Sequence, residues 1–512
     1  MENQEKDREW KTMRIVAEQM ELSRELPVVV GNVDYQMFQK CLERLDELLR
    51  LSGLEEVYVQ NRLVAWQEEG RKAAAQEGRA YKEPSGKEQA RHQKMCRQAL
   101  RCNLARQLTE KEYRKFSRRV AESHLLQWFC RIERVELVHV PSKSALERYD
   151  KMAPESEVRR LVDLLNRQAV TEWERLDLAE ALALDVYFSD TTCVKANIHF
   201  PTDWVLLRDG VRTLMKGVKL IRKHGLKHRM PEPDLFLRQI NRLSIEMSQS
   251  RRRPDSAKRR KAILRQMKRL TKVVQSHAQR YVLRLQQAWE QTDLREGQMK
   301  RIVFRLQGVV EQLPEAIRQA HERIIGDRKV ANRDKNLSLY EPDIHVLVRN
   351  KADAEVEFGN TLLLAEQTDG LILDWKLEQA ISCGDVALLQ PSVERVKAAI
   401  GQYPRAAGAD RGFDSKGNRR WLEEQGIQNA LCPRAPQELK ERMGDSTFRN
   451  IQKRRAQTEA RIGILKNDFL GRPLRSKGFE HREKAVAWAI LAHNVWLLAR
   501  LPRAGEVLKK AA

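Results

Sequence analysis

Long apolar runs and closely spaced cysteines are what this 512-residue chain lacks. No stretch of about 18 apolar residues is present to span a bilayer, and the opening residues, MENQEKDREWK, do not read as a signal peptide. The seven cysteines are scattered, and none forms a CxxC pair. The sequence therefore argues against a membrane partner, a disulfide framework and a zinc site, and it favours the reducing environment of the cytoplasm.

Acidic residues are too few to balance the basic ones. Lys and Arg number 95 against 71 Asp and Glu, which gives a formal net charge of +24. Charged residues make up 32% of the chain and hydrophobic ones 41%, as in a folded protein rather than a disordered one. The length predicts roughly two to four domains. An excess of positive charge this large indicates a polyanionic partner, most often nucleic acid, with a solvated basic surface as the plainer alternative.

The amino-terminal part is predicted to be helical in two regions. Residues 1–86 form helices with a polar, Gly-containing linker, and residues 87–180 form basic amphipathic helices. In the second region, a helix opening at Thr109, a turn at Val140-Pro141 and a helix opening at Ser144 predict a helix-turn-helix-like DNA-binding domain. Short basic helices also occur on ordinary surfaces, so base-specific readout stays open. The cations predicted to contact DNA here are Arg118, Lys143 and Arg148.

A long basic helical region follows at residues 205–335. Within it, residues 251–280 hold twelve Lys and Arg against one acid, Asp255. Apolar residues recur at helical spacing in two stripes, Ile263, Met267, Leu270 and Val274, then Ile302, Leu306, Val309 and Leu313. Such stripes are usually core, and Pro314 is expected to kink or end the second helix. We predict a helical bundle whose outer face contacts DNA or only water, and the local charge imbalance favours DNA. The cations predicted to contact DNA here are Arg251, Arg252 and Arg253.

Three acidic residues, far apart in the sequence, lie on segments that predict strands and a helix. Asp190 lies in ALDVYFSDTTCVKA, a strand that we expect to end near it, and Asp410 lies near the carboxyl end of a strand over residues 405–413. Glu459 lies on a basic helix. Further strands are predicted over residues 356–359, 361–366 and 371–379, with a turn at 368–370.

The order of these elements is that of a ribonuclease H-like core. It runs strand with acid, three strands, helix, strand with acid, helix, strand, helix with acid. We therefore predict a multidomain, mostly α protein whose α/β ribonuclease H-like core, built on a mixed sheet, is interrupted by the helical region at 205–335. The core is expected in two parts, residues 181–204 and 336–502, followed by a tail at 503–512.

The three acids suit phosphoryl transfer with two metal ions. Two Mg²⁺ ions about 3.5–4 Å apart activate the attacking oxygen and stabilise the leaving one, and Mg²⁺ prefers a few carboxylates with water and substrate phosphate. By geometry, Asp190 would bridge the ions while Asp410 and Glu459 would each hold one, with Mn²⁺ able to substitute. Arg455 and Lys466, on nearly the same helix face as Glu459, would hold the scissile strand. Each acid alone also has an ordinary interpretation, as a turn cap or a surface ion-pair partner.

The motifs around these acids resemble those of DDE-type transposases of bacterial insertion sequences, most closely the ISNCY-like group. DTTCVKANIHFPTDWVLLRDGVR (190–212) is similar to that group's first-aspartate motif, with Phe200 where Tyr is usual. VEFGNTLLLAEQTDGLILDW (356–375) and ADRGFDSKGN (409–418) are similar to the strands before the second aspartate and to its motif. The resemblance runs from about residue 90 to residue 500.

The helix with the third acid carries a further part of the resemblance. The spacing of Arg455, Glu459 and Lys466 matches the R-E-K part of the Y-R-E-K signature of related transposases, whose Tyr position is Gln452 here. The closing segment LAHNVWLLARL (491–501) is similar to the last helix of the family.

The resemblance implies an enzyme of DNA recombination that moves a mobile element. It would bind the terminal inverted repeats in double-stranded DNA, cut the element ends with water and join the 3′-hydroxyl to target DNA, using Mg²⁺. A homodimer or higher oligomer on DNA, at the nucleoid of a bacterial cytoplasm, is also implied. Two alternatives stay open: a catalytically inactive, transposase-derived DNA-binding protein, and another ribonuclease H-like nuclease.

Overall fold

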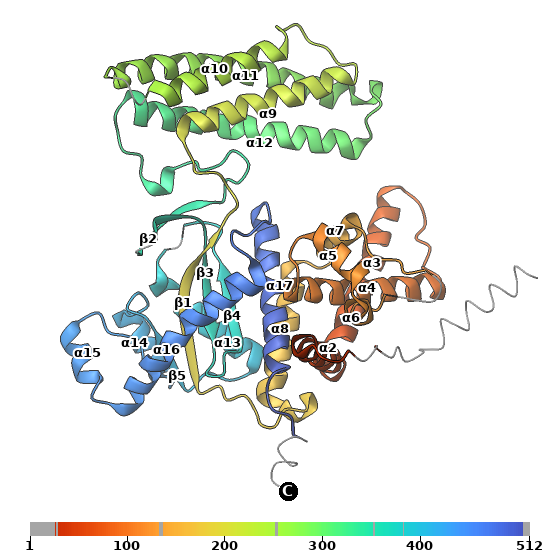
Figure 1. Cartoon of the computed structure of the whole chain (residues 1–512), viewed down its shortest axis with the longest axis vertical. Coiled ribbons are helices and arrows are strands. Elements are labelled where there is room, and N and C mark those ends of the chain that lie inside the picture. The colour runs from red at the N-terminus through yellow and green to blue at the C-terminus, as the bar shows by residue number, and fades with distance from the viewer. Residues whose placement is uncertain are drawn as a thin grey trace, which may run out of the picture. The chain divides into compact units, whose positions relative to one another are not determined.

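The computed structural model of the chain (Figure 1) describes residues 26, 29–132, 137–250, 254–351, 354–381 and 383–504. It divides into two compact units, Met1–Leu182 with Trp488–Ala512, and Ala183–Ala487. Within the described ranges, no helix is both long enough and apolar enough to cross a bilayer. Residues 1–86 and 87–180 fall in the same unit. The division of the chain into six segments that we expect from the sequence therefore stays a prediction.

The first unit is helical. Its elements are α2 (Val33–Ser52), α3 (Leu54–Gln76), α4 (Gly86–Leu108), α5 (Tyr113–Glu122), α6 (His124–Phe129), α7 (Lys143–Met152), α8 (Glu155–Thr171) and the 3-10 turn η1 (Trp173–Leu176). The helix predicted to open at Thr109 begins at Tyr113 instead, because Thr109 still closes α4 with its backbone N–H on Ala105. The helix predicted from Ser144 begins at Lys143, capped by Ser142. The short helix α6 lies between α5 and α7, so the predicted turn at Val140-Pro141 is only part of their connection.

The inserted region is a bundle of long helices that lie side by side (Figure 1). Its elements are α9 (Asp203–Lys223), α10 (Pro233–Ser250), α11 (Ser256–Ala288) and α12 (Glu296–Ala320), with the short 3-10 helices η2 (Trp289–Gln291) and η4 (Asn332–Asp334) and the π-helix η3 (His321–Ile325). The stripe predicted at Ile263, Met267, Leu270 and Val274 is buried in the bundle core. Pro314 does not end its helix, because buried Leu313 and Ala316 on either side hold α12 in that core.

A mixed sheet of six strands forms the other part of the second unit within the described residues. Its strands are β1 (Val186–Lys195), β2 (His345–Lys351), β3 (Ala354–Glu366), β4 (Ile372–Leu377), β5 (Ala406–Ala409) and β6 (Gln428–Asn429). β1 lies between antiparallel β3 and parallel β5, and β6 continues the sheet beyond β5. β2 pairs with the first half of β3 and β4 with its second half. This arrangement is consistent with the predicted ribonuclease H-like core.

Helices and turns follow the strands in the predicted order. They are η5 (Asp385–Leu388), α13 (Leu389–Ile400), α14 (Lys416–Glu424), α15 (Pro436–Arg442), α16 (Ser446–Ile464), the π-helix η6 (Leu465–Leu470) and α17 (Phe479–Leu498). The strands predicted over 356–359 and 361–366 are one strand, β3, because β1 pairs with it without interruption from Gly359 to Glu366. The strand predicted over 371–379 is β4, and β2 was not among the three predicted strands.

A glycine lies at a close approach between β3 and β1. A Cβ atom at Gly359 would collide with the carbonyl oxygen of Val194, which is backbone and has no rotamer to change. Gly308, within α12, has open space around the same position. We expect Gly359→Ala to destabilise the protein by about 1–3 kcal/mol, as overpacking does, and Gly308→Ala to stabilise it by about 0.5–1 kcal/mol. Urea unfolding of both variants checks this, and an unchanged midpoint for Gly359→Ala would contradict it.

Candidate active site

The pairing of β1 with β5 brings Asp190 and Asp410 together. The strands are parallel, and their last paired residues are Ser189 and Ala409. Asp190 is the next residue of β1 and Asp410 is the first residue after β5, at the point where the paired backbones lie about 5 Å apart. The prediction that the strand ends near Asp190 is wrong: β1 continues to Lys195, because β3 still pairs with it after β5 has ended.

Glu459 comes from α16, which packs across β1 and β5 (Figure 1). Phe448 and Ile451 of this helix are buried against Phe188 of β1. Thr458 is buried, while its neighbour Glu459 is exposed. Glu459 therefore does not lie on the face of α16 that is buried against the sheet.

The charges of both other acids affect the pKa of the Asp190 carboxyl group. Its pKa is raised to about 6, first by burial and next by the charge of Asp410, and Glu459 adds to the rise. A hydrogen bond of 2.7 Å from the backbone N–H of Thr191 and the charge of Arg455 oppose it. The structure thus brings the three predicted acids and Arg455 into one electrostatic group.

Asp410 is held by the turn after it, and a further acid lies nearby. The backbone N–H of Gly412 donates to Asp410 Oδ1 at 2.8 Å. A Cβ atom at Gly412 would come within 2.6 Å of Asp385 Oδ2 and 2.9 Å of Asp410 Oδ1, so only glycine allows this approach. Asp385 was not predicted from the sequence, where nothing connects the start of η5 with the end of β5.

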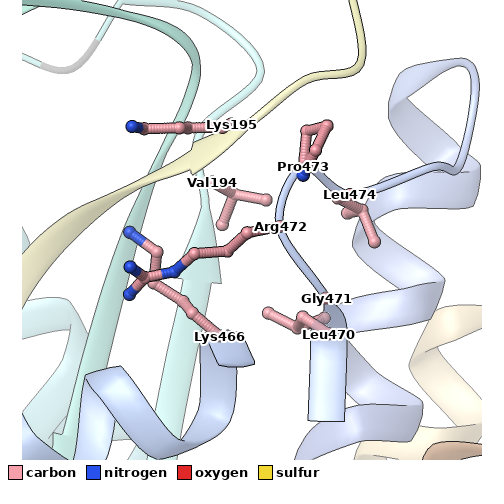
Figure 2. Close-up of a pocket in the computed structure, with 8 residues that line it drawn as sticks. All are labelled: Val194, Lys195, Lys466, Leu470, Gly471, Arg472, Pro473 and Leu474. Carbon is pink, nitrogen blue, oxygen red and sulfur yellow. The ribbon is translucent and has the colours of Figure 1, made fainter. Parts of the chain in front are cut away.

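Lys466 lies on the acids' face of the sheet. Its Nζ donates to Thr192 Oγ1 at 2.9 Å, and Thr192 is two residues beyond Asp190, on the same face of β1. Figure 2 shows Lys466 and Arg472 extending to the same side of a cavity beside the end of β1. The cavity, about 10 Å³, has room for about one water and none for a nucleotide.

The carboxylate oxygens of the three acids are of the type that binds Mg²⁺, but they are not arranged as a set of metal ligands. Within the described residues, no group of three or more His, Cys, Asp and Glu side chains is arranged to hold a metal ion. The atoms that do come together are carboxylate oxygens, the ligands that Mg²⁺ prefers. Glu459 is exposed, so its side chain can change rotamer with little loss of packing. The residues therefore fit Mg²⁺ by chemical type.

The other predicted DNA contacts lie in different parts of the chain. Arg118 of α5 and Arg148 of α7 are exposed, on helices that pack against each other. Lys143 is also exposed and pairs with Glu147 at 2.7 Å. The predicted contacts Arg251, Arg252 and Arg253 lie outside the described residues.

Comparison with known proteins gives one match. Residues 360–495 match the family model described as Transposase DDE domain. The matched segment contains Asp410 and Glu459, while Asp190 and the helical bundle precede it. No curated protein and no solved structure is similar enough to the chain to count as a match. The match supports a role in transposition-related DNA cleavage.

The raised pKa of Asp190 predicts a pH-dependent stability. The folded chain holds this proton more tightly than the unfolded chain, whose Asp pKa is about 3.9, so stability falls as pH rises from about 4 through 6. With chelator present, we expect Asp190→Asn to be more stable than wild type by about 2–3 kcal/mol at pH 8, and the gain to shrink toward pH 4. Thermal unfolding across this range measures it.

The control is Asp185→Asn. Asp185 precedes β1 and pairs at 3.2 Å with Arg405, which is exposed. This variant should show no such pH-dependent gain. If Asp190→Asn were no more stable than wild type at any pH, Asp190 would not be buried beside like charges as described.

Proposed function

We propose that the chain is a DNA transposase of the ISNCY-like group of insertion sequences. It binds the terminal inverted repeats of its element, hydrolyses the phosphodiester at the element ends and joins the 3′-hydroxyl to target DNA. The observation that carries the proposal is the group of Asp190, Asp410 and Glu459, assembled by two parallel strands and a covering helix. The Transposase DDE domain match over the last two acids supports it.

The three acids are the proposed ligands of Mg²⁺ or Mn²⁺. When bound, two such ions activate the attacking oxygen and stabilise the leaving one. Arg455, whose charge acts on Asp190, and Lys466, bonded to Thr192, supply cations on the acids' side of β1 and hold the phosphate of the scissile strand. Water breaks the phosphodiester, and the 3′-hydroxyl then attacks target DNA, so no covalent bond between protein and DNA forms.

The outer face of α11 supports DNA binding in the inserted bundle. This helix of 33 residues contains no Asp or Glu. Its exposed cations are Lys258, Arg265, Arg269, Lys272, Arg280 and Arg284. Across the described residues, no ion pair joins these six to an acid, whereas Lys219 of α9 pairs with Asp234 and Lys300 of α12 with Glu296. Cations without an acidic partner are the ones able to neutralise phosphates and release counterions.

The first unit would recognise the element ends. Arg118 and Arg148, on the packed helices α5 and α7, are the proposed contacts, together with Lys143 once it exchanges Glu147 for a phosphate. Arg251, Arg252 and Arg253, which precede α11 in the sequence, are further proposed DNA contacts. A homodimer or higher oligomer would pair the two ends, in a bacterial cytoplasm at the nucleoid.

Cleavage and joining test the proposal on a plasmid that carries this gene with its native flanks. We expect the wild-type protein to cut and join at the flanks with Mg²⁺ or Mn²⁺ and not with chelator. Glu459→Ala should lose both products while DNA binding stays nearly unchanged, because the carboxylate serves the metals and not the duplex. Gln457→Ala, exposed on the same helix, is the matched control with normal activity.

The other outcomes separate the alternatives. Binding to the flanks without cutting in any metal would identify an inactive DNA-binding protein. Cutting without joining would identify another ribonuclease H-like nuclease. A Glu459→Ala variant that still cuts would remove Glu459 from the site.

Salt dependence tests the α11 surface. We expect replacement of Lys258, Arg265, Arg269 and Lys272 by Gln to weaken DNA binding and to reduce the slope of log affinity against log salt by up to about 0.9 per lost phosphate contact. The control replaces Lys219, Arg222 and Lys300, which are paired with acids, and should change the slope little. An equal slope for wild type and the α11 variant would make this face a solvated one.

A further inference from the structure

A buried carboxylate fastens α16 to the sheet. Glu366, the last residue of β3, is fully buried, and two arginines of α16 contact it. Arg454 Nη1 lies 3.3 Å from Oε1, and Arg461 Nε donates to Oε2 at 3.1 Å. A carboxylate taken out of water is stable only when cations and hydrogen bonds satisfy it. Each oxygen of Glu366 therefore depends on a different turn of the same helix.

The contacts of Arg454 reach beyond Glu366. Its Nε donates to the backbone oxygen of Thr368 at 2.9 Å, in the turn between β3 and β4. Its guanidinium also lies 5.1 Å from the ring centroid of Phe188 on β1. Phe188 pairs with Glu366 across the β1–β3 ladder and lies two residues before Asp190. The arginine thus connects α16 with the strand that carries Asp190.

Arg461 completes the attachment two turns later. Its guanidinium packs so closely over Gly370 that any side chain there would collide with it. Gly370 has a φ of +92°, a conformation that glycine adopts without strain, so the turn offers both the shape and the space that Arg461 needs. Arg454 and Arg461 are seven residues apart and so face the same side of the helix.

The spacing along α16 relates this attachment to the acids. Glu459 lies between Arg454 and Arg461 in the sequence, and Arg455 lies one turn before Glu459. Successive residues of an α-helix point about 100° apart. A slip of α16 by one residue against β3 would therefore turn Glu459 away from Asp190, and it would also break the contacts to Glu366.

We propose that Glu366, which is bound by Arg454 and Arg461, is a positioning residue that fixes the rotation of α16 about its axis. This rotation determines how closely Glu459 approaches Asp190 and Asp410. The proposal rests on the proposed function for the role of those acids. It adds a residue that touches neither metal nor DNA and acts through the helix.

The test is Glu366→Gln in the full-length protein. Gln keeps the size of the side chain but removes the charge that holds both arginines. We expect the Mg²⁺ concentration for half-maximal cleavage to rise about 10- to 100-fold, the range seen when a residue that orients metal ligands is lost. The rate at saturating metal and the affinity for flank DNA should change little. A mere loss of folded protein would lower the maximal rate and leave the metal requirement unchanged.

Glu357→Gln is the matched control. Glu357 lies on the same strand and pairs with Lys195 at 2.9 Å, so the same substitution removes an ion pair that has no part in holding α16. Its metal requirement should equal that of wild type. Glu366→Gln with an unchanged metal requirement would overturn the proposal.

A binding measurement separates this proposal from the proposed function. Binding of Mn²⁺ to each protein, followed by loss of the paramagnetic resonance signal of the free ion, should be weaker for Glu366→Gln by a similar factor. If wild type binds Mn²⁺ but never cuts, the proposed function fails, and the shift in Mn²⁺ affinity still decides the role of Glu366. Equal affinities for wild type and Glu366→Gln overturn that role.

A second variant covers a failure of Glu366→Gln to fold. Arg461→Lys keeps the positive charge but loses the planar fork that reaches Glu366 over Gly370. It should raise the metal requirement in the same direction by a smaller factor. A normal metal requirement for this variant would also overturn the proposal.

Discussion

The register between β1 and β5 is the constraint on which the candidate site depends. Their pairing stops at Ser189 and Ala409, so Asp190 and Asp410 emerge side by side at the point where β1 loses one neighbour. A slip of one residue would turn Asp190 to the opposite face of the sheet. β3 prevents this slip, because it pairs with β1 along its length from Phe188 to Lys195.

Charge is arranged differently on the two sides of α16. Toward β1 and β5, like charges gather, and Asp410 and Glu459 both raise the pKa of Asp190. Toward the β3–β4 turn, opposite charges meet at Glu366. The repulsion in the acidic group disfavours its metal-free form, while the attraction at Glu366 holds the helix in place. One helix thus takes part in both a repulsive cluster of like charges and an attractive cluster of opposite charges.

Features that depend on local pattern could be predicted from the sequence. The buried stripe from Ile263 to Val274, the order of strands and helices and the neighbourhood of Asp190, Asp410 and Glu459 all rest on periodicity or motif spacing. Features that depend on distant partners escaped prediction. The length of β1 is set by β3, and Asp385 approaches Asp410 only through the fold. The continuation of α12 past Pro314 is likewise a result of core packing and not of propensity.

The two ends of the inserted bundle are bonded to each other. α9 begins at Asp203, soon after β1, and η3 follows α12 on the way to β2. The buried carboxylate of Asp203 accepts from Gln319 at 2.8 Å and from Arg323 at 3.0 Å, so the entry and exit of the insertion are bonded to each other. The chain between β1 and β2 is therefore closed by the bundle itself, and the entropy of closing so long a connection does not fall on the β1–β3 ladder. The sheet can keep the register that places the acids whatever the outer face of α11 contacts.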